Sequence, residues 1–134
     1  MTKTLLLTAS LLAAATGAFA ESNEAVVARG RYLVENVAGC GDCHSPRDPR
    51  GQIPAGQHLM GTPLPFAPTV PMPAWAAQAP QIAGLPGYTD AQAVTLFTQG
   101  TKPDGSMPRP PMPQFRFTAE DARAVVAYLR SLKK

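Results

Sequence analysis

A pentapeptide, Cys40-Gly41-Asp42-Cys43-His44, constrains what this chain can fold into more than any other part of it. It holds both cysteines of the 134-residue sequence. Two thiols spaced C-x-x-C with histidine directly after them are the attachment signature of a c-type haem. Each sulfur can add to one porphyrin vinyl group, and the adjacent imidazole can then reach the iron. We therefore predict one covalent haem c, bound through Cys40 and Cys43, with His44 as proximal iron ligand.

Three other interpretations of the pentapeptide stay open. A structural zinc site needs four nitrogen or sulfur ligands, and the only other histidine, His58, lies far from a second knuckle pattern. A thioredoxin-like redox pair should follow a strand in a βαβ pattern, and no such alternation is visible. A plain disulfide between Cys40 and Cys43 is possible in an exported protein, but it leaves His44 without a role.

The first 20 residues resemble a secretory signal. Lys3 supplies the positive charge, Leu5–Ala15 is apolar, and Ala18-Phe19-Ala20 is a small-residue cleavage site. The apolar run is shorter than the ~20 residues that a membrane span needs, although an uncleaved anchor is the alternative. We predict a signal over residues 1–20, one domain over residues 21–134, export to the periplasm and no transmembrane segment in the mature chain. Export agrees with haem attachment outside the cytoplasm.

The charge of the chain gives little support to a nucleic-acid partner. The formal net charge is +3, and the removal of Lys3 with the signal leaves +2. Two haem propionates would bring that value close to zero. No run of lysine and arginine is present, so we expect no binding of nucleic acid.

The prolines divide the mature chain into three parts. All 15 prolines lie between Pro46 and Pro113, and proline disrupts helix interiors. Apolar residues are scattered among them, which is typical of a stiffened loop wrapped over an apolar object. The flanking periodicity and caps predict helices over residues 22–38, 90–99 and about 119–132. Because no segment alternates strongly with a period of two, we expect an all-α fold with little or no sheet.

Specific residues mark the ends and faces of these helices. In the first helix, Val26, Gly30, Leu33 and Val37 fall on one face, widened by Val27 and Val34, and Gly39 is a plausible stop. Thr89 with Gln92 forms a capping-box pattern before the middle helix. Thr118 is the expected N-cap of the last helix.

A six-coordinate electron carrier needs a second iron ligand, and methionine or a second histidine is the usual choice. The methionines beyond the predicted signal are Met60, Met72, Met107 and Met112. We prefer Met112, because it precedes the last helix by a short tether and the flanking Pro111 and Pro113 restrict its backbone. Met107 is the second choice and Met72 the third, followed by His58 or no ligand at all. We expect His58 to be an exposed loop residue.

Taken together, these features resemble class I cytochromes c of the small monohaem type. The resemblance covers most of the mature chain. The segments Gly30–Val34 and Gly39–Arg47 are similar to the haem domains of cytochrome subunits that serve periplasmic dehydrogenases. So are Pro110–Pro113, Phe117-Thr118 and Tyr128-Leu129 near the end of the chain. The resemblance implies three main helices and a proline-rich loop around one covalent haem.

The resemblance also implies particular contacts. The last helix should cross the first at Gly30, which would lie against Tyr128 or Leu129. A backbone carbonyl after the motif should accept the N–H of the proximal imidazole, with Pro54 or Pro49 as candidates.

The tryptophan of the chain has a counterpart in the family as well. Trp75 resembles the residue that often donates to a haem propionate there, although packing by its ring alone is equally open.

The functional expectation is outer-sphere electron transfer without enzymatic activity. One electron would pass between a periplasmic dehydrogenase and an acceptor such as a terminal oxidase or another cytochrome. The alternative is a five-coordinate haem with peroxidase or gas-binding activity, for which His58 would be a suitable distal base. A fixed subunit of one dehydrogenase and a freely diffusing carrier are not separated by the sequence.

Overall fold

The computed structural model describes residues 22–132, so the predicted signal over residues 1–20 lies outside the described part. The described residues form four α-helices, one π-helical turn and a two-stranded sheet. In chain order the elements are α1 (Asn23–Tyr32), η1 (Leu33–Val37), α2 (Cys40–His44), β1 (Thr62–Pro63), β2 (Gln78–Ala79), α3 (Asp90–Gln99) and α4 (Ala119–Ser131).

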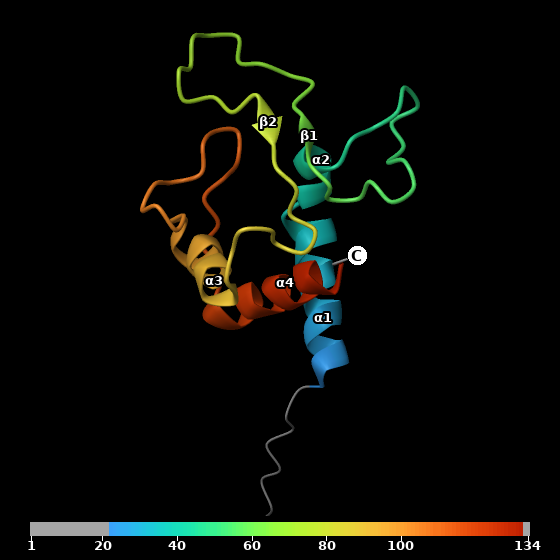
Figure 1. Ribbon diagram of the computed structural model, residues 1–134, viewed down its shortest axis with the longest axis vertical. Coiled ribbons are helices and arrows are strands. Elements are labelled where there is room, and N and C mark those ends of the chain that lie inside the picture. The colour runs from blue at the N-terminus through green and yellow to red at the C-terminus, as the bar shows by residue number, and fades with distance from the viewer. Residues whose placement is uncertain (1–21, 133–134) are drawn as a thin grey trace, which may run out of the picture.

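The prediction of an all-α fold is confirmed. The strands β1 and β2 are two residues long and pair antiparallel, with Thr62 opposite Ala79, and they make up the whole sheet of residues 22–132. The helices α1, α3 and α4 gather toward one end of the molecule, whereas the long loops extend from the other end (Figure 1). None of the helices in the described range has both the length and the apolarity needed to cross a bilayer.

The predicted first helix is divided into an α-helical and a π-helical part. The Ser22 hydroxyl accepts a hydrogen bond from the Ala25 amide at the start of α1. Near the end of the helix, the amide of Ala38 donates to the carbonyl of Leu33 over 2.8 Å, five residues back. This wider turn changes which side chains share a face. Val34 is therefore fully buried and Val37 is 55% exposed, so the expected place of Val37 on the buried face was wrong.

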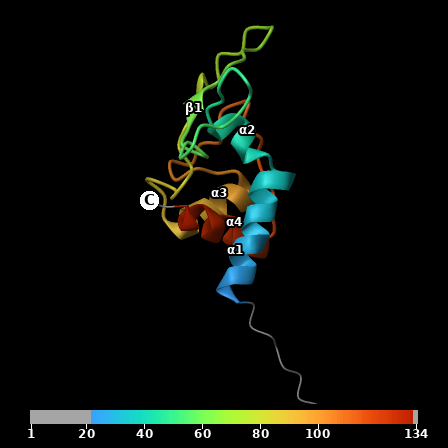
Figure 2. The ribbon, with the colours of Figure 1, turned by 90° about the vertical axis from the view of Figure 1, so that its right-hand side faces the viewer.

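The helices α4 and α1 cross, as both views of the ribbon show (Figures 1 and 2), and Gly30 of α1 lies against α4. An ideal Cβ on Gly30 would lie 2.9 Å from the Cβ of Tyr128 and would overlap the Ala124 carbonyl. The expected contact with Tyr128 is confirmed, and Ala124 lies closer still. The Arg29 side chain also pairs with Asp121 of α4, with 2.9 Å between Nε and Oδ1.

The caps of α3 and α4 follow the sequence prediction. The Thr89 hydroxyl accepts from the Gln92 amide, and the Gln92 side chain accepts from the Thr89 amide, so the capping box is complete. The Thr118 hydroxyl accepts from the Asp121 amide at the start of α4.

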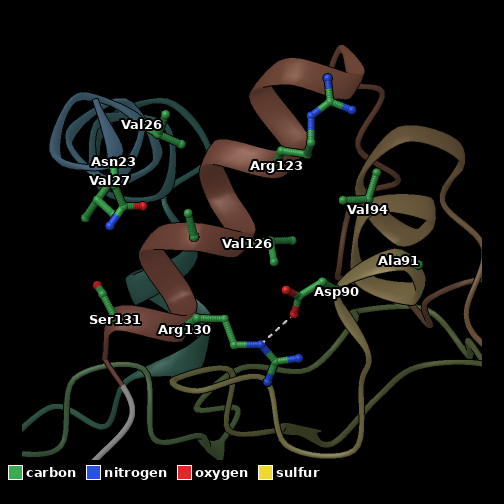
Figure 3. A pocket seen from close by; sticks show the side chains of 11 residues that line it. Asn23, Val26, Val27, Asp90, Ala91, Val94, Arg123, Val126, Arg130 and Ser131 are labelled. Atoms are coloured by element: carbon green, nitrogen blue, oxygen red, sulfur yellow. Dashed lines mark hydrogen bonds and ion pairs between the residues drawn. The ribbon is translucent and has the colours of Figure 1, made fainter. Parts of the chain in front are cut away.

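One arginine joins the end of α4 to the start of α3. The Arg130 guanidinium donates to Asp90 over 2.8 Å, across a groove lined by valines of α1, α3 and α4 (Figure 3). It also donates to the carbonyls of Gly84 and Tyr88 in the segment before α3. The loop that leads into α3 is thereby fastened to the helical core, whose fully buried side chains include Leu59, Leu129, Val34 and Val125.

Candidate functional site

The short helix α2 holds the two cysteines close together. Gly39, with a φ of 60°, occupies the left-handed region and separates η1 from α2, which confirms the predicted stop. Cys40 and Cys43 then stand three residues apart on α2, where they share a face. Both are free, half-buried thiols rather than a disulfide. Burial, and secondarily the negative charge of Glu35, raises the pKa of Cys40 to about 11.

His44 ends α2 and is buried, with 6% of its surface exposed. Its Nδ1 lies 2.7 Å from the carbonyl oxygen of Pro80. A carbonyl can only accept, so Nδ1 carries the proton and Nε2 keeps its lone pair. Burial also lowers the pKa of His44, which favours the neutral imidazole that can bind a metal.

The identity of this carbonyl corrects the sequence prediction, which named Pro54 or Pro49. The residue that accepts is Pro80, 36 positions from His44 and directly after β2. The pairing of β1 with β2 and the 2.7 Å hydrogen bond from the Gly61 amide to the His44 carbonyl bring this distant segment to α2. No local sequence signal marks such a partner, because it depends on tertiary pairing.

His58 is more constrained than the expected exposed loop residue. It is half-buried, and its Nε2 lies 2.8 Å from Oε1 of Glu35. The same carboxylate oxygen accepts from the Tyr128 hydroxyl over 2.6 Å. His58 also lies beside α2, since a Cβ on Gly41 would be 3.6 Å from its Cε1. Sequence reasoning missed Glu35 as the centre of this network, because a single acidic residue on a helix is usually solvated.

The candidate distal methionines differ in their surroundings. Met112 is half-buried, and its amide donates to the Arg109 carbonyl over 3.2 Å. Met107 is 58% exposed, and its sulfur accepts from Gln114 over 3.0 Å. Met72 is 41% exposed. These surroundings leave the preference for Met112 in place as a prediction.

Trp75 has a buried indole nitrogen without a partner in the described part of the chain. Its ring meets Phe66 edge to face, with 5.9 Å between the centroids. Buried N–H groups are nearly always hydrogen-bonded, so an unpartnered one calls for an acceptor supplied by another group. The donor role of Trp75 toward a propionate therefore stays a prediction that its buried N–H supports.

The zinc interpretation of the pentapeptide gains no support. Among residues 22–132, no three His, Cys, Asp or Glu side chains converge on a position where they could hold a metal ion.

The sequence model of the cytochrome c family matches residues 27–133. The chain belongs to the cytochrome c family. A comparison with curated proteins gives no match. Members of this family bind haem c covalently and use it for electron transfer, which agrees with the class I resemblance and with a carrier rather than an enzyme.

The residues of this cytochrome fit a haem c by their own chemistry. Two free thiols with the required spacing stand next to a buried neutral imidazole, whose Nε2 is available. The unpartnered N–H of Trp75 is a suitable donor to a propionate. The predicted distal ligand, the Met112 thioether, would complete the donor set.

Proposed function

We propose that this cytochrome is an exported, periplasmic electron carrier with one haem c. In this proposal Cys40 and Cys43 form the thioether links, His44 is the proximal ligand and Met112 is the distal ligand. The observation that carries it is the hydrogen bond from His44 Nδ1 to Pro80, 2.7 Å long and buried beside the two free thiols.

Each of these side chains has a definable task. The bound haem supplies a one-electron couple, in which iron alternates between the ferrous and ferric states. Pro80 holds the orientation of His44 and makes its Nε2 more basic. A thioether at Met112 is a soft ligand that favours the ferrous state. The Trp75 N–H would donate a hydrogen bond to a haem propionate.

The electron donor and acceptor are proposed from the resemblance to cytochrome subunits of periplasmic dehydrogenases. A periplasmic dehydrogenase would supply the electron, and a terminal oxidase or another cytochrome would accept it. Export through the predicted signal supports a periplasmic site. A freely diffusing carrier would be recovered alone from the periplasm, whereas a fixed subunit would co-purify with its dehydrogenase.

The test uses the mature holoprotein and two matched variants. A haem-stained gel establishes covalent attachment, and the ferric spectrum shows whether the weak red sulfur-to-iron band is present. We expect Met112→Ala to abolish this band and to lower the potential by on the order of 0.1 V. Met72→Ala, the control, should change little.

Two results would overturn the proposal in different ways. If Met72→Ala abolishes the band and Met112→Ala does not, the distal ligand is misassigned. A high-spin ferric spectrum that changes with carbon monoxide or peroxide at physiological potentials would instead support the five-coordinate alternative.

A further inference from the structure

Two loops far apart in sequence are fastened to each other next to Met112. The Arg109 side chain donates from Nε to the Ala74 carbonyl over 3.0 Å and from Nη2 to the Trp75 carbonyl over 2.6 Å. The Ala76 amide donates in turn to the Pro110 carbonyl over 2.7 Å. Residues 109–110 and 74–76 are therefore joined by three hydrogen bonds.

Arg109 is tied to Met112 through the backbone of their own loop. The Met112 amide donates to the Arg109 carbonyl over 3.2 Å, which closes a turn between the two residues. A displacement of Arg109 is therefore transmitted directly to Met112.

Few hydrogen bonds fasten the loop that carries Met112 to other segments, although the Phe115 side chain packs against the helical core. Among residues 22–132, the hydrogen bonds that link residues 101–116 to other segments come from Arg109 and from the Pro110 carbonyl. The remaining side-chain bonds stay inside the loop, such as those of Arg116 to the Phe115 carbonyl and to Gln114. Near Met112, the hydrogen bonds that tie the loop to another segment are therefore those of Arg109 and of the Pro110 carbonyl.

We propose that Arg109 is a positioning residue for the distal ligand of this cytochrome. Its guanidinium fixes the Met112 loop against the segment that bears Trp75. The position of the Met112 thioether relative to the Trp75 indole N–H is thereby maintained. This inference rests on the proposed function, because it takes Met112 as the distal ligand.

The physical reason is the weakness of a thioether ligand. A loop that is flexible before its methionine binds the iron loses conformational entropy on binding. This loss weakens the methionine–iron interaction, so an added ligand such as imidazole competes better for the iron. A planar guanidinium that donates to two successive carbonyls removes much of that freedom in advance. Lysine keeps the charge, but its single ammonium lacks the fork that spans both carbonyls.

The experiment measures how easily imidazole displaces the distal ligand in the ferric holoprotein. The variants are Arg109→Gln and Arg109→Lys, and loss of the red band reports displacement. Two bonds to a charged donor are lost in Arg109→Gln, so we expect imidazole to bind about tenfold more tightly. Arg109→Lys should be intermediate. The control is Arg116→Gln, because Arg116 bonds only within its own loop, and it should match the wild type.

One further measurement separates positioning from a general loss of structure. In Arg109→Gln, the stability measured by guanidinium unfolding and circular dichroism should fall by much less than tenfold in the folding equilibrium constant.

A tenfold fall in that constant would show a general loosening of the structure instead of positioning. So would an imidazole affinity of Arg116→Gln that rises as much as that of Arg109→Gln.

The failures of the two proposals are distinguishable. If Met112→Ala retains the red band, the ligand assignment fails, and the inference about Arg109 fails with it. If Met112→Ala loses the band but Arg109→Gln binds imidazole like the wild type, the inference alone is wrong.

Discussion

The crossing of α1 and α4 makes a sharp prediction about Gly30. An added Cβ would lie 2.5 Å from the carbonyl carbon of Ala124 and 2.9 Å from the Cβ of Tyr128. Ordinary carbon–carbon contacts are about 3.5–4.0 Å, so the helices would have to separate by roughly 1 Å. Both obstacles belong to the rigid part of α4, and neither is the end of a flexible side chain.

Two effects of opposite sign act in Gly30→Ala. Alanine in a helix interior is favoured over glycine by about 1 kcal/mol. Overpacking typically costs about 1–3 kcal/mol, and this overlap is with backbone, so its cost lies above that range. We expect a net loss of about 3 kcal/mol in the free energy of unfolding. For a domain of this size, that loss lowers the melting temperature by roughly 12 °C or more.

The measurement is guanidinium unfolding of the holoprotein, followed by far-ultraviolet circular dichroism. Gly41→Ala is the matched control, because Gly41 is also helical and its added Cβ would meet the nearest atom, Cε1 of His58, at an ordinary 3.6 Å. That variant should stay within about 1 kcal/mol of the wild type. If Gly30→Ala is as stable as the wild type or more so, helix propensity outweighs the crossing and the packing argument is wrong.

Two further predictions concern the capping of α3 and the ionisation of Tyr128. Thr89→Ala removes the capping box and should cost about 1 kcal/mol in unfolding free energy, whereas Thr95→Ser, which keeps a hydroxyl, should cost less. Burial, then the hydrogen bond to Glu35, raises the pKa of Tyr128 well above 10.0, so its contribution to stability is complete below that pH and is lost as the pH rises further. In Tyr128→Phe, unfolding free energies measured from pH 9 to 11 should fall less steeply than in the wild type, and parallel curves would contradict this.

Local signals in the sequence were enough for several parts of the fold. The capping box at Thr89, the N-cap at Thr118 and the left-handed stop at Gly39 each depend on residues within a few positions of one another. The family model over residues 27–133 agrees with the class I resemblance carried by the pentapeptide and the segments around it. Such features are predictable because hydrogen bonds between near neighbours form wherever the chain takes that local conformation.

The α-helical period failed within η1. The π-helical turn of η1 contains more residues than an α-helical turn, and the spacing of valines and leucines does not reveal this. The prediction therefore placed Val37 on the buried face, whereas it is exposed. The π turn places Val34 in the core, where α4 packs against this part of the chain. Tertiary packing here overrode the period that the sequence displays.

The chain alone specified its chemistry: the thiol pair, the adjacent imidazole and the helices that bracket a proline-rich middle. Only the tertiary structure decided which distant groups serve that chemistry, namely Pro80 at His44, Glu35 between His58 and Tyr128, and Arg109 beside Trp75. These partners lie 23 to 93 positions apart along the chain. Such pairs leave no local periodicity, because chain closure and packing of the whole domain determine which carbonyl or carboxylate reaches each donor.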